Sequence, residues 1–227
     1  MIKLDKVSKM FGLGNGGLSD ISLLIERGEF VFLVGPTGSG KTTLFRLLIR
    51  EMLPNSGSIV IADVDIIKLP HKKIPLLRKK IGVVFQDLKL LSDRTIFENI
   101  ALPLEVAGVD AISAKKRVEE LLNQVSIATH KDKFPIQLSG GELQRAAIAR
   151  ALVLSPEILL ADEPTGNLDP KTSREIVKLL QEINEKGTTI IMATHNSDVV
   201  NALKKRVVTL EKGKLIRDEK KGKYDVS

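Results

Sequence analysis

Short apolar runs rich in β-branched residues recur along the chain, and they lack regular alternation between apolar and polar positions. A strand that is covered on both faces has this pattern, because neither of its sides meets water. The four clearest runs are Phe30–Val34, Ile81–Phe85, Ile158–Ala161 and Thr189–Ala193. Residues at helical spacing follow most runs: Leu44, Leu47 and Leu48 in one helix, and Ile176, Leu179, Leu180 and Ile183 in another. Strands that alternate with helices predict an α/β fold with a mainly parallel core sheet.

The two ends of the chain have shorter strand patterns. Near the N-terminus, glycine and asparagine residues separate three strand candidates, which predict a small antiparallel β subdomain. These candidates are Ile2–Val7, Ser22–Ile25 and Ser58–Ala62, and the sequence GLGNGG at Gly12–Gly17 predicts a loop. Near the C-terminus, Val207–Leu210 and Lys214–Arg217 predict a hairpin, and the charged tail after it is expected to be exposed.

The middle of the chain, from Asp87 to Gln137, has little strand character. Ser113 can cap a helix whose apolar face contains Val118, Leu121, Leu122 and Val125. We therefore expect a helical lobe at about residues 87–137, inserted into a core of about 1–86 and 138–227. Together they form a single domain over residues 1–227.

Composition limits the kinds of partner. The net charge of +7 favours an anionic partner such as a nucleotide, a nucleic acid or an anionic membrane surface, or else reflects a generally basic surface. With no tryptophan and one tyrosine, stacking on a string of bases is not expected. The absence of cysteine fits a reducing cytosol. The longest apolar runs are strand-sized, so any link to a membrane is expected to run through a partner.

The sequence GPTGSGKT matches the whole G-x-x-x-x-G-K-[ST] phosphate-binding loop, between a predicted strand and a predicted helix. Its glycines let backbone N–H groups surround a β-phosphate, while Lys41 can reach the β- and γ-phosphates and Thr42 can offer a hydroxyl to Mg²⁺. The expected nucleotide contacts are Gly35, Pro36, Thr37, Gly38, Ser39, Gly40, Lys41, Thr42 and Thr43.

Two carboxylates follow the buried run in the sequence EILLADEP. The carboxyl ends of parallel strands are where open α/β sheets bind ligands. Asp162 is suited to hold the Mg²⁺ shell, and Glu163 is suited to polarise a water for in-line attack on a γ-phosphate. Without the phosphate-binding loop, the same pair could simply cap a helix.

The sequence LSGGELQR, at Leu138–Arg145, has the features of a second phosphate-binding element. Ser139, Gly140 and Gly141 precede a predicted helix, so small residues expose backbone N–H groups at a helix N-terminus.

Together these motifs resemble those of the ATP-binding-cassette ATPases over nearly the whole chain. Further elements follow in that family's order. VVFQD places Gln86 between the core and the helical lobe, GNLD ends at Asp169, and MATHN places His195 after the last core strand. Phe11 stands where the family has an aromatic residue that stacks on adenine.

The resemblance implies that two subunits bind head to tail and enclose two ATP molecules. In each site one subunit contributes Lys41, Thr42, Gln86, Asp162, Glu163 and His195, and the other contributes Ser139 and Gly141. Glu163, His195 and Gln86 are the expected catalytic residues, and Thr42, Gln86 and Asp162 the expected Mg²⁺ ligands. The resemblance also implies that Asp169 links the two sites. The expected ligands are ATP and Mg²⁺, and the expected working unit is a homodimer.

Two details of the sequence indicate which branch of the family the chain resembles most. LSGGE, in place of the commoner LSGGQ, and ADEPTGNLD are usual in the branch that contains lipoprotein-release, macrolide-export and cell-division ATPases. Within it, PLLRKKIGVVFQDLKLL and the C-terminal segment are most similar to the cell-division members. This resemblance implies an integral membrane partner that docks near Asp87–Leu91, a place at the cytoplasmic face of the division site, and regulation of cell-wall hydrolases outside the membrane.

Three alternatives remain at this point. An export or lipoprotein-release ATPase of the same branch has the same catalytic residues. A DNA-repair or ribosomal ATPase with this core is disfavoured by the short lobe and the single cassette. A non-hydrolysing ATP-gated module is disfavoured by Glu163.

Overall fold

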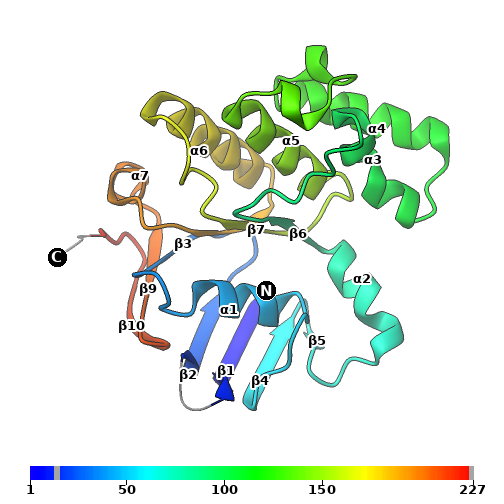
Figure 1. Cartoon of the computed structure of the whole chain (residues 1–227). Coiled ribbons are helices and arrows are strands. Elements are labelled where there is room, and N and C mark those ends of the chain that lie inside the picture. The colour runs from blue at the N-terminus through cyan, green and yellow to red at the C-terminus, as the bar shows by residue number, and fades with distance from the viewer. Residues whose placement is uncertain (13–15, 225–227) are drawn as a thin grey trace.

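In the computed structural model, which describes residues 1–12 and 16–224, a six-stranded sheet lies at the centre (Figure 1). Its order is β10 (Lys214–Glu219), β9 (Arg206–Glu211), β3 (Phe30–Val34), β8 (Thr189–Ala193), β7 (Ile158–Asp162) and β6 (Ile81–Val84). Every neighbouring pair is parallel except β10 with β9. The four predicted core strands and the predicted hairpin are confirmed.

The strand β3 shows why its sequence has no polar face. Phe30, Phe32 and Val34 pack into one hydrophobic cluster with residues of the helices above the sheet. Val31 and Leu33 pack into a second cluster with α1 (Lys41–Leu48) and the antiparallel sheet. All five side chains are buried, and burying a side chain of this size contributes about 1.5–3 kcal/mol to folding.

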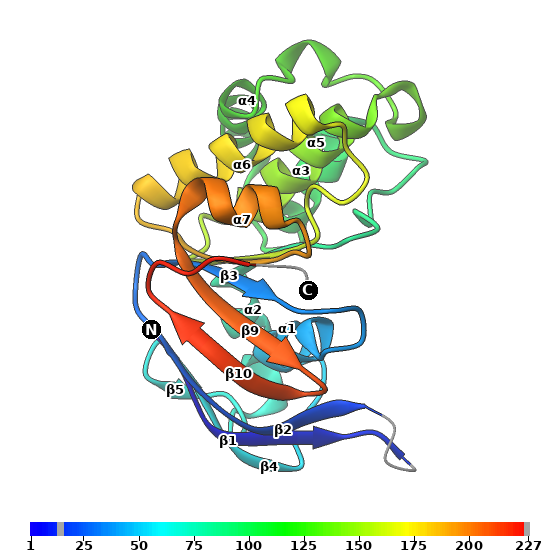
Figure 2. The same cartoon turned by 90° about the vertical axis from the view of Figure 1, so that its left-hand side faces the viewer.

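A second, antiparallel sheet confirms the predicted β subdomain. Its order is β2 (Gly17–Ile25), β1 (Ile2–Met10), β4 (Ser56–Ile61) and β5 (Val64–Asp65). The sheet and α1 lie on one side of the central sheet, as Figures 1 and 2 show. A short 3₁₀ turn, η2 (His71–Lys73), and α2 (Ile74–Lys79) lead from β5 back to β6. Residues 13–15 of the predicted glycine-rich loop and 225–227 of the tail lie outside the described residues.

Helices fill the chain between β6 and β7. They are α3 (Ile96–Val106), α4 (Ala111–Gln124) and α5 (Gly140–Leu152), with 3₁₀ turns η3 (Ala128–His130) and η4 (Pro135–Gln137) before α5. With α6 (Pro170–Glu185) and α7 (Ser197–Leu203) they cover the other face of the central sheet (Figure 2). Within residues 1–12 and 16–224, no helix combines the length and apolar character needed to cross a membrane.

The prediction that Ser113 caps a helix is wrong. Ser113 lies inside α4, and the N-cap is Asp110, whose carboxylate accepts a hydrogen bond from the Ser113 backbone N–H at 3.0 Å. Aspartate and serine are both good N-caps, and here they stand three residues apart. The helix starts at the earlier of the two, which places Ser113 at the position that the cap bonds.

A charged cluster around Arg206 joins the two sheets. Its guanidinium donates to the Asp218 carboxylate at 2.7 Å, to the Glu29 carboxylate at 2.9 Å and to the Leu24 carbonyl at 2.8 Å. The side chain is only 14% exposed, so these partners replace most of its water. The cluster therefore ties β9 and β10 to the end of β2 and to the residue before β3.

Arg206→Ala is expected to lower the free energy of unfolding by about 1–3 kcal/mol, because it leaves the partly buried Glu29 carboxylate and the more exposed Asp218 carboxylate without their partner. Urea denaturation monitored by circular dichroism measures the loss. Arg217→Ala is the control, since Arg217 and Glu219 form an exposed ion pair whose removal should cost less than about 1 kcal/mol. Equal losses in the two variants would contradict the structural role of the cluster.

Candidate nucleotide-binding site

The phosphate-binding loop joins the end of β3 to the start of α1. Gly35 has φ 144°, and a β-carbon there would lie 2.0 Å from the Leu210 carbonyl oxygen. Gly40, the residue before α1, has φ 109°, and a β-carbon there would meet the Leu18 side chain at 2.6 Å. Both positions require glycine. The chain can therefore turn sharply enough to direct the N-terminus of α1 at the loop.

Lys41 lies at the first position of α1 and is 8% exposed. Its ammonium donates to the carbonyl oxygens of Gly35 at 2.6 Å and Pro36 at 3.1 Å. Burial lowers the pKa of Lys41, and the carboxylates of Glu163 and Asp162 oppose this effect. A cation held in such a poorly solvated place interacts strongly with a phosphate that enters the loop.

Asp162 ends β7 and meets Thr42 from α1. The Thr42 hydroxyl donates to Asp162 Oδ2 at 3.0 Å. Burial raises the pKa of Asp162, and the hydrogen bond from Thr42 acts in the opposite direction. Gln86, two residues after β6, lines the same cavity. A hydroxyl, a carboxylate and an amide are the hard oxygen donors that Mg²⁺ prefers, so this donor set fits that ion.

Glu163 is held in an unusual backbone conformation. It has φ 48°, in the left-handed region, and its N–H donates to the Ala193 carbonyl at the end of β8. Its carboxylate Oε1 lies 2.9 Å from Nδ1 of His195, which follows β8. Non-glycine residues in this region are uncommon and often lie at functional sites. Neighbouring strands thus fix Glu163 and His195 against each other.

One cavity of about 350 Å³ brings most of the predicted site together. The predicted residues that line it are Phe11, Thr37, Gly38, Gly40, Lys41, Thr42, Thr43, Gln86, Asp162, Glu163 and His195. Gly16 and Gly17 also line it and were not predicted, although the GLGNGG sequence was a signal for them. Gly35, Pro36 and Ser39 belong to the loop without lining the cavity, and Ser39 is buried.

The residues of LSGGELQR, which we call the signature, do not line this cavity. Ser139 is the N-cap of α5, and both its N–H and its hydroxyl donate to Glu142 Oε2 at 2.7 Å. These bonds lower the pKa of Glu142, the hydroxyl bond most. Glu142 thus completes a capping box, which explains how a glutamate fits at this position of the signature.

The Asp169 loop packs beside the signature. Asp169 caps α6 by accepting from the backbone N–H groups of Lys171 at 2.9 Å and Thr172 at 3.0 Å. A β-carbon on Gly141 would lie 2.6 Å from the Thr172 side chain, so the start of α5 approaches α6 very closely. Ser139, Gly140, Gly141 and Asp169 therefore share a surface separate from the chain's own cavity.

Arg150 holds the loop after Gln86, a role that the sequence did not predict. It lies in the last turn of α5 and donates to the carbonyl oxygens of Lys89 at 2.6 Å and Leu88 at 2.5 Å. Both of these residues have left-handed backbones, with φ 52° and 56°. Burial lowers the pKa of Arg150. The loop after Gln86 is thus attached to the helix that begins at the signature.

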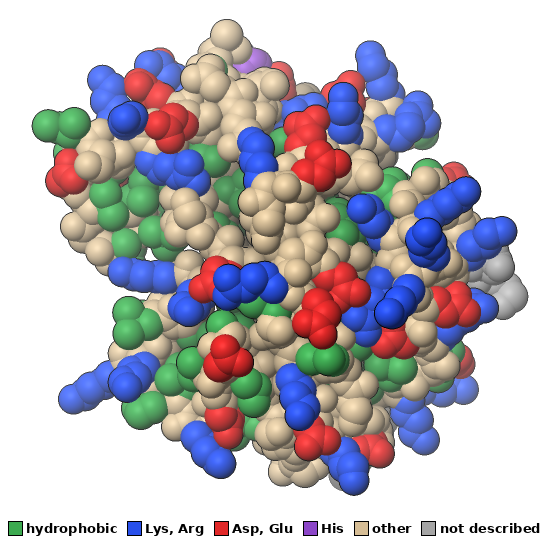
Figure 3. Space-filling model, turned by 180° about the vertical axis from the view of Figure 1, so that it is seen from behind, with side chains coloured by type: hydrophobic (Ala, Val, Ile, Leu, Met, Phe, Trp, Pro, Cys, Tyr) green, Lys and Arg blue, Asp and Glu red, His purple; other side chains and the backbone are tan. Residues whose placement is uncertain are grey.

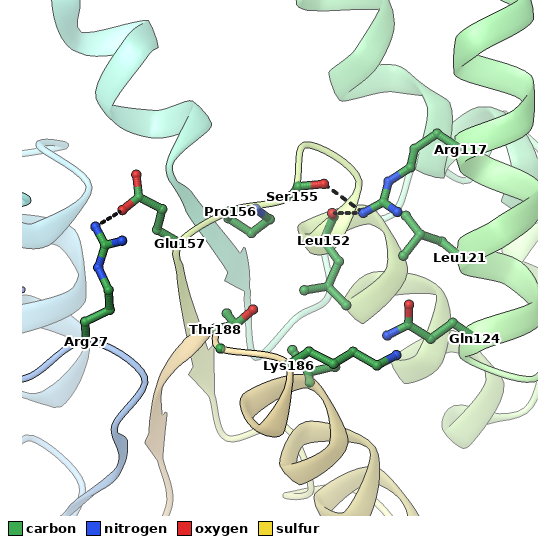
Figure 4. Close-up of a pocket in the computed structure, with 12 residues that line it drawn as sticks. Arg27, Arg117, Leu121, Gln124, Leu152, Ser155, Pro156, Glu157, Lys186 and Thr188 are labelled. Carbon is green, nitrogen blue, oxygen red and sulfur yellow. Dashed lines mark hydrogen bonds and ion pairs between the residues drawn. The ribbon is translucent and has the colours of Figure 1, made fainter.

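A different pocket, of about 400 Å³, lies at the opposite end of the strands from the nucleotide cavity (Figure 4). It includes Glu157 and Thr188, the residues before β7 and β8, so it borders the amino ends of these strands. Arg117 donates there to Ser155 Oγ, and Arg27 pairs with Glu157 (Figure 4). Ligands of open α/β sheets bind at the carboxyl ends of strands, so this pocket is not the nucleotide site.

A Lys-containing glycine loop before a helix, with carboxylates at the carboxyl ends of neighbouring parallel strands, defines a phosphate-loop nucleotide hydrolase. The pattern of the ABC transporter family matches residues 18–166, and the chain belongs to this family. The chain is 50% identical over 224 residues to the cell division ATP-binding protein FtsE of Bacillus subtilis strain 168, covering 99% of this chain and 98% of that protein. It is 49% identical to FtsE of Streptococcus pneumoniae serotype 2 strain D39, covering 99% and 97%.

Solved structures agree with this family. A dimeric ATP-binding cassette in a post-hydrolysis state, bound to ADP and Pi, superposes with a TM-score of 0.88 at 36% identity. The match covers 99% of this chain and 100% of that chain. The mainly parallel core sheet, the antiparallel sheet and the phosphate-binding loop are therefore those of an ABC-type ATPase fold.

Proposed function

We propose that this chain is the ATP-binding and hydrolysing subunit of a membrane complex in bacterial cell division, similar to FtsE with its membrane partner FtsX. The observation that carries this proposal is the identity of 50% over 99% of the chain with FtsE of Bacillus subtilis. A cavity lined by most of the residues expected to bind the nucleotide accompanies that identity. The reaction is the hydrolysis of ATP to ADP and phosphate.

The cavity supports a pose for the nucleotide. Backbone N–H groups of the loop and the N-terminus of α1 bind the β-phosphate, and Lys41 leaves its carbonyl partners to bind the β- and γ-phosphates. Phe11 is 40% exposed at the rim of the cavity, where its ring can cover adenine. The ammonium nitrogen of Lys9, on β1, lies 5.8 Å from the centre of that ring. These residues bind and orient ATP before any bond breaks.

The hydrolytic step belongs to the carboxylates. When bound by Thr42, Asp162 and Gln86, Mg²⁺ supplies charge neutralisation at the phosphate oxygens. Glu163 accepts a proton from water as that water attacks the γ-phosphate, and ADP leaves on the opposite side. His195 holds the Glu163 carboxylate through Nδ1 and presents the rest of its ring to the cavity. Gln86, which lines the same cavity, would help to hold the ion and to orient the attacking water.

The separation of the signature from the chain's own cavity supports a homodimer. Ser139 and Gly141 bind the γ-phosphate held by the neighbouring subunit, and Asp169 contacts the opposite site. Each ATP then joins two subunits, and its hydrolysis loosens them. The similar cassette bound to ADP and Pi is described as dimeric, which supports this arrangement.

A groove beside the loop after Gln86 suits the membrane partner. It encloses about 600 Å³ and its lining is mostly apolar, with Phe85, Leu102, Pro103 and Leu154 among the lining residues. Figure 3 shows a hollow on its left-hand side, with hydrophobic side chains on both sides of it. A cytoplasmic helix of an FtsX-like protein fits such a groove, next to the predicted docking segment Asp87–Leu91.

In this proposal ATP-driven closure is transmitted through the groove to the membrane protein. The result is regulation of peptidoglycan hydrolases outside the membrane, and the subunit acts at the cytoplasmic face of the division site. The alternative is a lipoprotein-release or macrolide-export ATPase. Identification of the membrane protein that co-purifies with the chain separates the two, because their partners have different extracytoplasmic domains.

Leu102→Glu is expected to reduce the co-purified membrane partner at least about tenfold, because a carboxylate would be buried against an apolar helix. Affinity purification from solubilised membranes with quantitative mass spectrometry measures the loss. The control is Ile216→Glu, which places the same charge at a side chain 56% exposed on β10. ATP binding should remain within about twofold in both variants, since neither residue lines the cavity. Equal recovery of the partner by both would exclude the groove as the docking site.

A further inference from the structure

The segment from Lys68 to Lys80 is unusually basic. It contains Lys68, Lys72, Lys73, Arg78, Lys79 and Lys80, together with His71, and it has no acidic residue. It comprises η2, α2 and the residues on either side of them, and all six cationic residues are exposed. We call this segment the α2 face.

Several of these charges have no acidic partner. Lys68 lies 3.5 Å from Asp65 and Lys80 lies 3.1 Å from Glu157, while Arg78 donates to the carbonyl oxygens of Ile49 and Arg50. Among the described residues, Lys72, Lys73 and Lys79 form no ion pair within 4.0 Å. A cluster of exposed cations repels itself, so it favours an anionic surface as its neighbour.

Apolar side chains lie among these lysines. Leu76 is 59% exposed and Val64 is 40% exposed, although both are large and hydrophobic. They line a cleft of about 160 Å³ with Leu69 and Leu77, and the stems of Lys73 and Lys80 complete its walls. Figure 3 shows Lys and Arg side chains beside hydrophobic side chains at its lower left, on the side of the molecule that holds α2.

We propose that the α2 face binds the surface of an anionic phospholipid membrane. Lysines meet the headgroups there, while Leu76 and Val64 reach into the region below them. Each lysine near such a surface contributes about 1 kcal/mol of attraction, so a few lysines and an exposed leucine give reversible binding. A nucleic acid would use the cations and leave the apolar cleft exposed, so the combination favours lipid.

The position of the face fits this partner. Arg78 and Lys79 also line the groove that we assign to the membrane protein, so the α2 face borders that groove directly. A subunit with a membrane protein in its groove would thus hold the α2 face near the bilayer. Lipid binding by the isolated chain does not depend on that assignment, and it can be measured without the membrane partner.

The test is flotation of the purified chain with vesicles, either of phosphatidylcholine alone or with about 30% phosphatidylglycerol. We expect the chain to float with the anionic vesicles, and to float less as salt rises. The triple variant Lys72→Ala, Lys73→Ala, Lys79→Ala should lower the partition coefficient at least about tenfold. The control triple Lys115→Ala, Lys116→Ala, Lys178→Ala removes the same charge from exposed positions on α4 and α6 and should change it less than about threefold.

Leu76→Asp tests the apolar part of the face, with Leu24→Asp on the exposed side of β2 as its control. Only the first should weaken flotation. ATP binding and the thermal midpoint should match wild type in every variant, which separates lipid contact from misfolding. Equal losses in the two triple variants, or equal flotation with neutral vesicles, would overturn the proposal. Unchanged flotation of the α2-face triple would overturn it as well. If that variant also lost binding of an acidic protein or a nucleic acid, the face would bind that partner and not lipid.

Discussion

Glu163→Gln is expected to bind ATP normally and to hydrolyse it at least about a thousandfold more slowly than wild type. Glutamine keeps the shape of the side chain and an oxygen that can face His195, but it cannot accept the proton of the attacking water. The ATP-bound dimer should therefore accumulate. Release of phosphate measures the rate, and size-exclusion chromatography with ATP measures the dimer.

The control is Glu185→Gln, at the exposed end of α6, which removes a carboxylate without touching the cavity. It should hydrolyse ATP as wild type does and form no stable ATP dimer. Hydrolysis by Glu163→Gln at the wild-type rate would mean that another group accepts the proton.

Ser139→Arg is expected to reduce hydrolysis at least about a hundredfold while a single subunit still binds ATP with near-normal affinity. The arginine side chain would fill the surface at the start of α5 where the neighbour's γ-phosphate is expected. Because Ser139 lies outside the chain's own cavity, the bound nucleotide should not be affected directly. Fluorescent nucleotide titration measures binding, and phosphate release measures turnover.

The substitution also removes the hydroxyl of a capping box, which costs about 1 kcal/mol of stability. Ser139→Ala has the same cost in stability but adds no large side chain. It therefore separates the effect of lost stability from the effect of a blocked γ-phosphate surface. A mixture of Ser139→Arg with Lys41→Ala subunits gives a sharper test. If the signature acts on the neighbour, mixed dimers hold one complete site, and up to about a quarter of the wild-type rate returns. A mixture that stays inactive would indicate that the signature acts within its own subunit.

Local sequence patterns predicted the core strands and the phosphate-binding loop, because each of these elements depends on a few neighbouring residues. The unbroken apolar runs identified β3, β6, β7 and β8 and their burial on both faces. The spacing of GPTGSGKT placed Lys41 and Thr42 on the first turn of α1. Parallel pairing then brings the ends of β7 and β8 together, so Asp162, Glu163 and His195 meet in one cavity.

Features that depend on distant pairs could not be predicted in the same way. Glu29 precedes Arg206 by 177 positions, and no local pattern indicates that the two side chains meet. The same holds for Arg150, whose acceptors are 61 and 62 positions earlier. The start of α4 was misplaced for the opposite reason, since two good capping residues stood close together and local rules did not rank them.

The hydrogen bonds of Arg150 connect α5 to the loop that follows Gln86. The helix has 13 residues and is therefore about 20 Å long, with Ser139 at one end and Arg150 in the last turn at the other. We expect a displacement of the loop at Leu88 and Lys89 to act on the helix through these two charge-assisted hydrogen bonds. A stiff rod transmits such a displacement along its whole length. We therefore expect motion at the groove and motion at Ser139 to be coupled through α5, which packs on β6 and joins the two places directly.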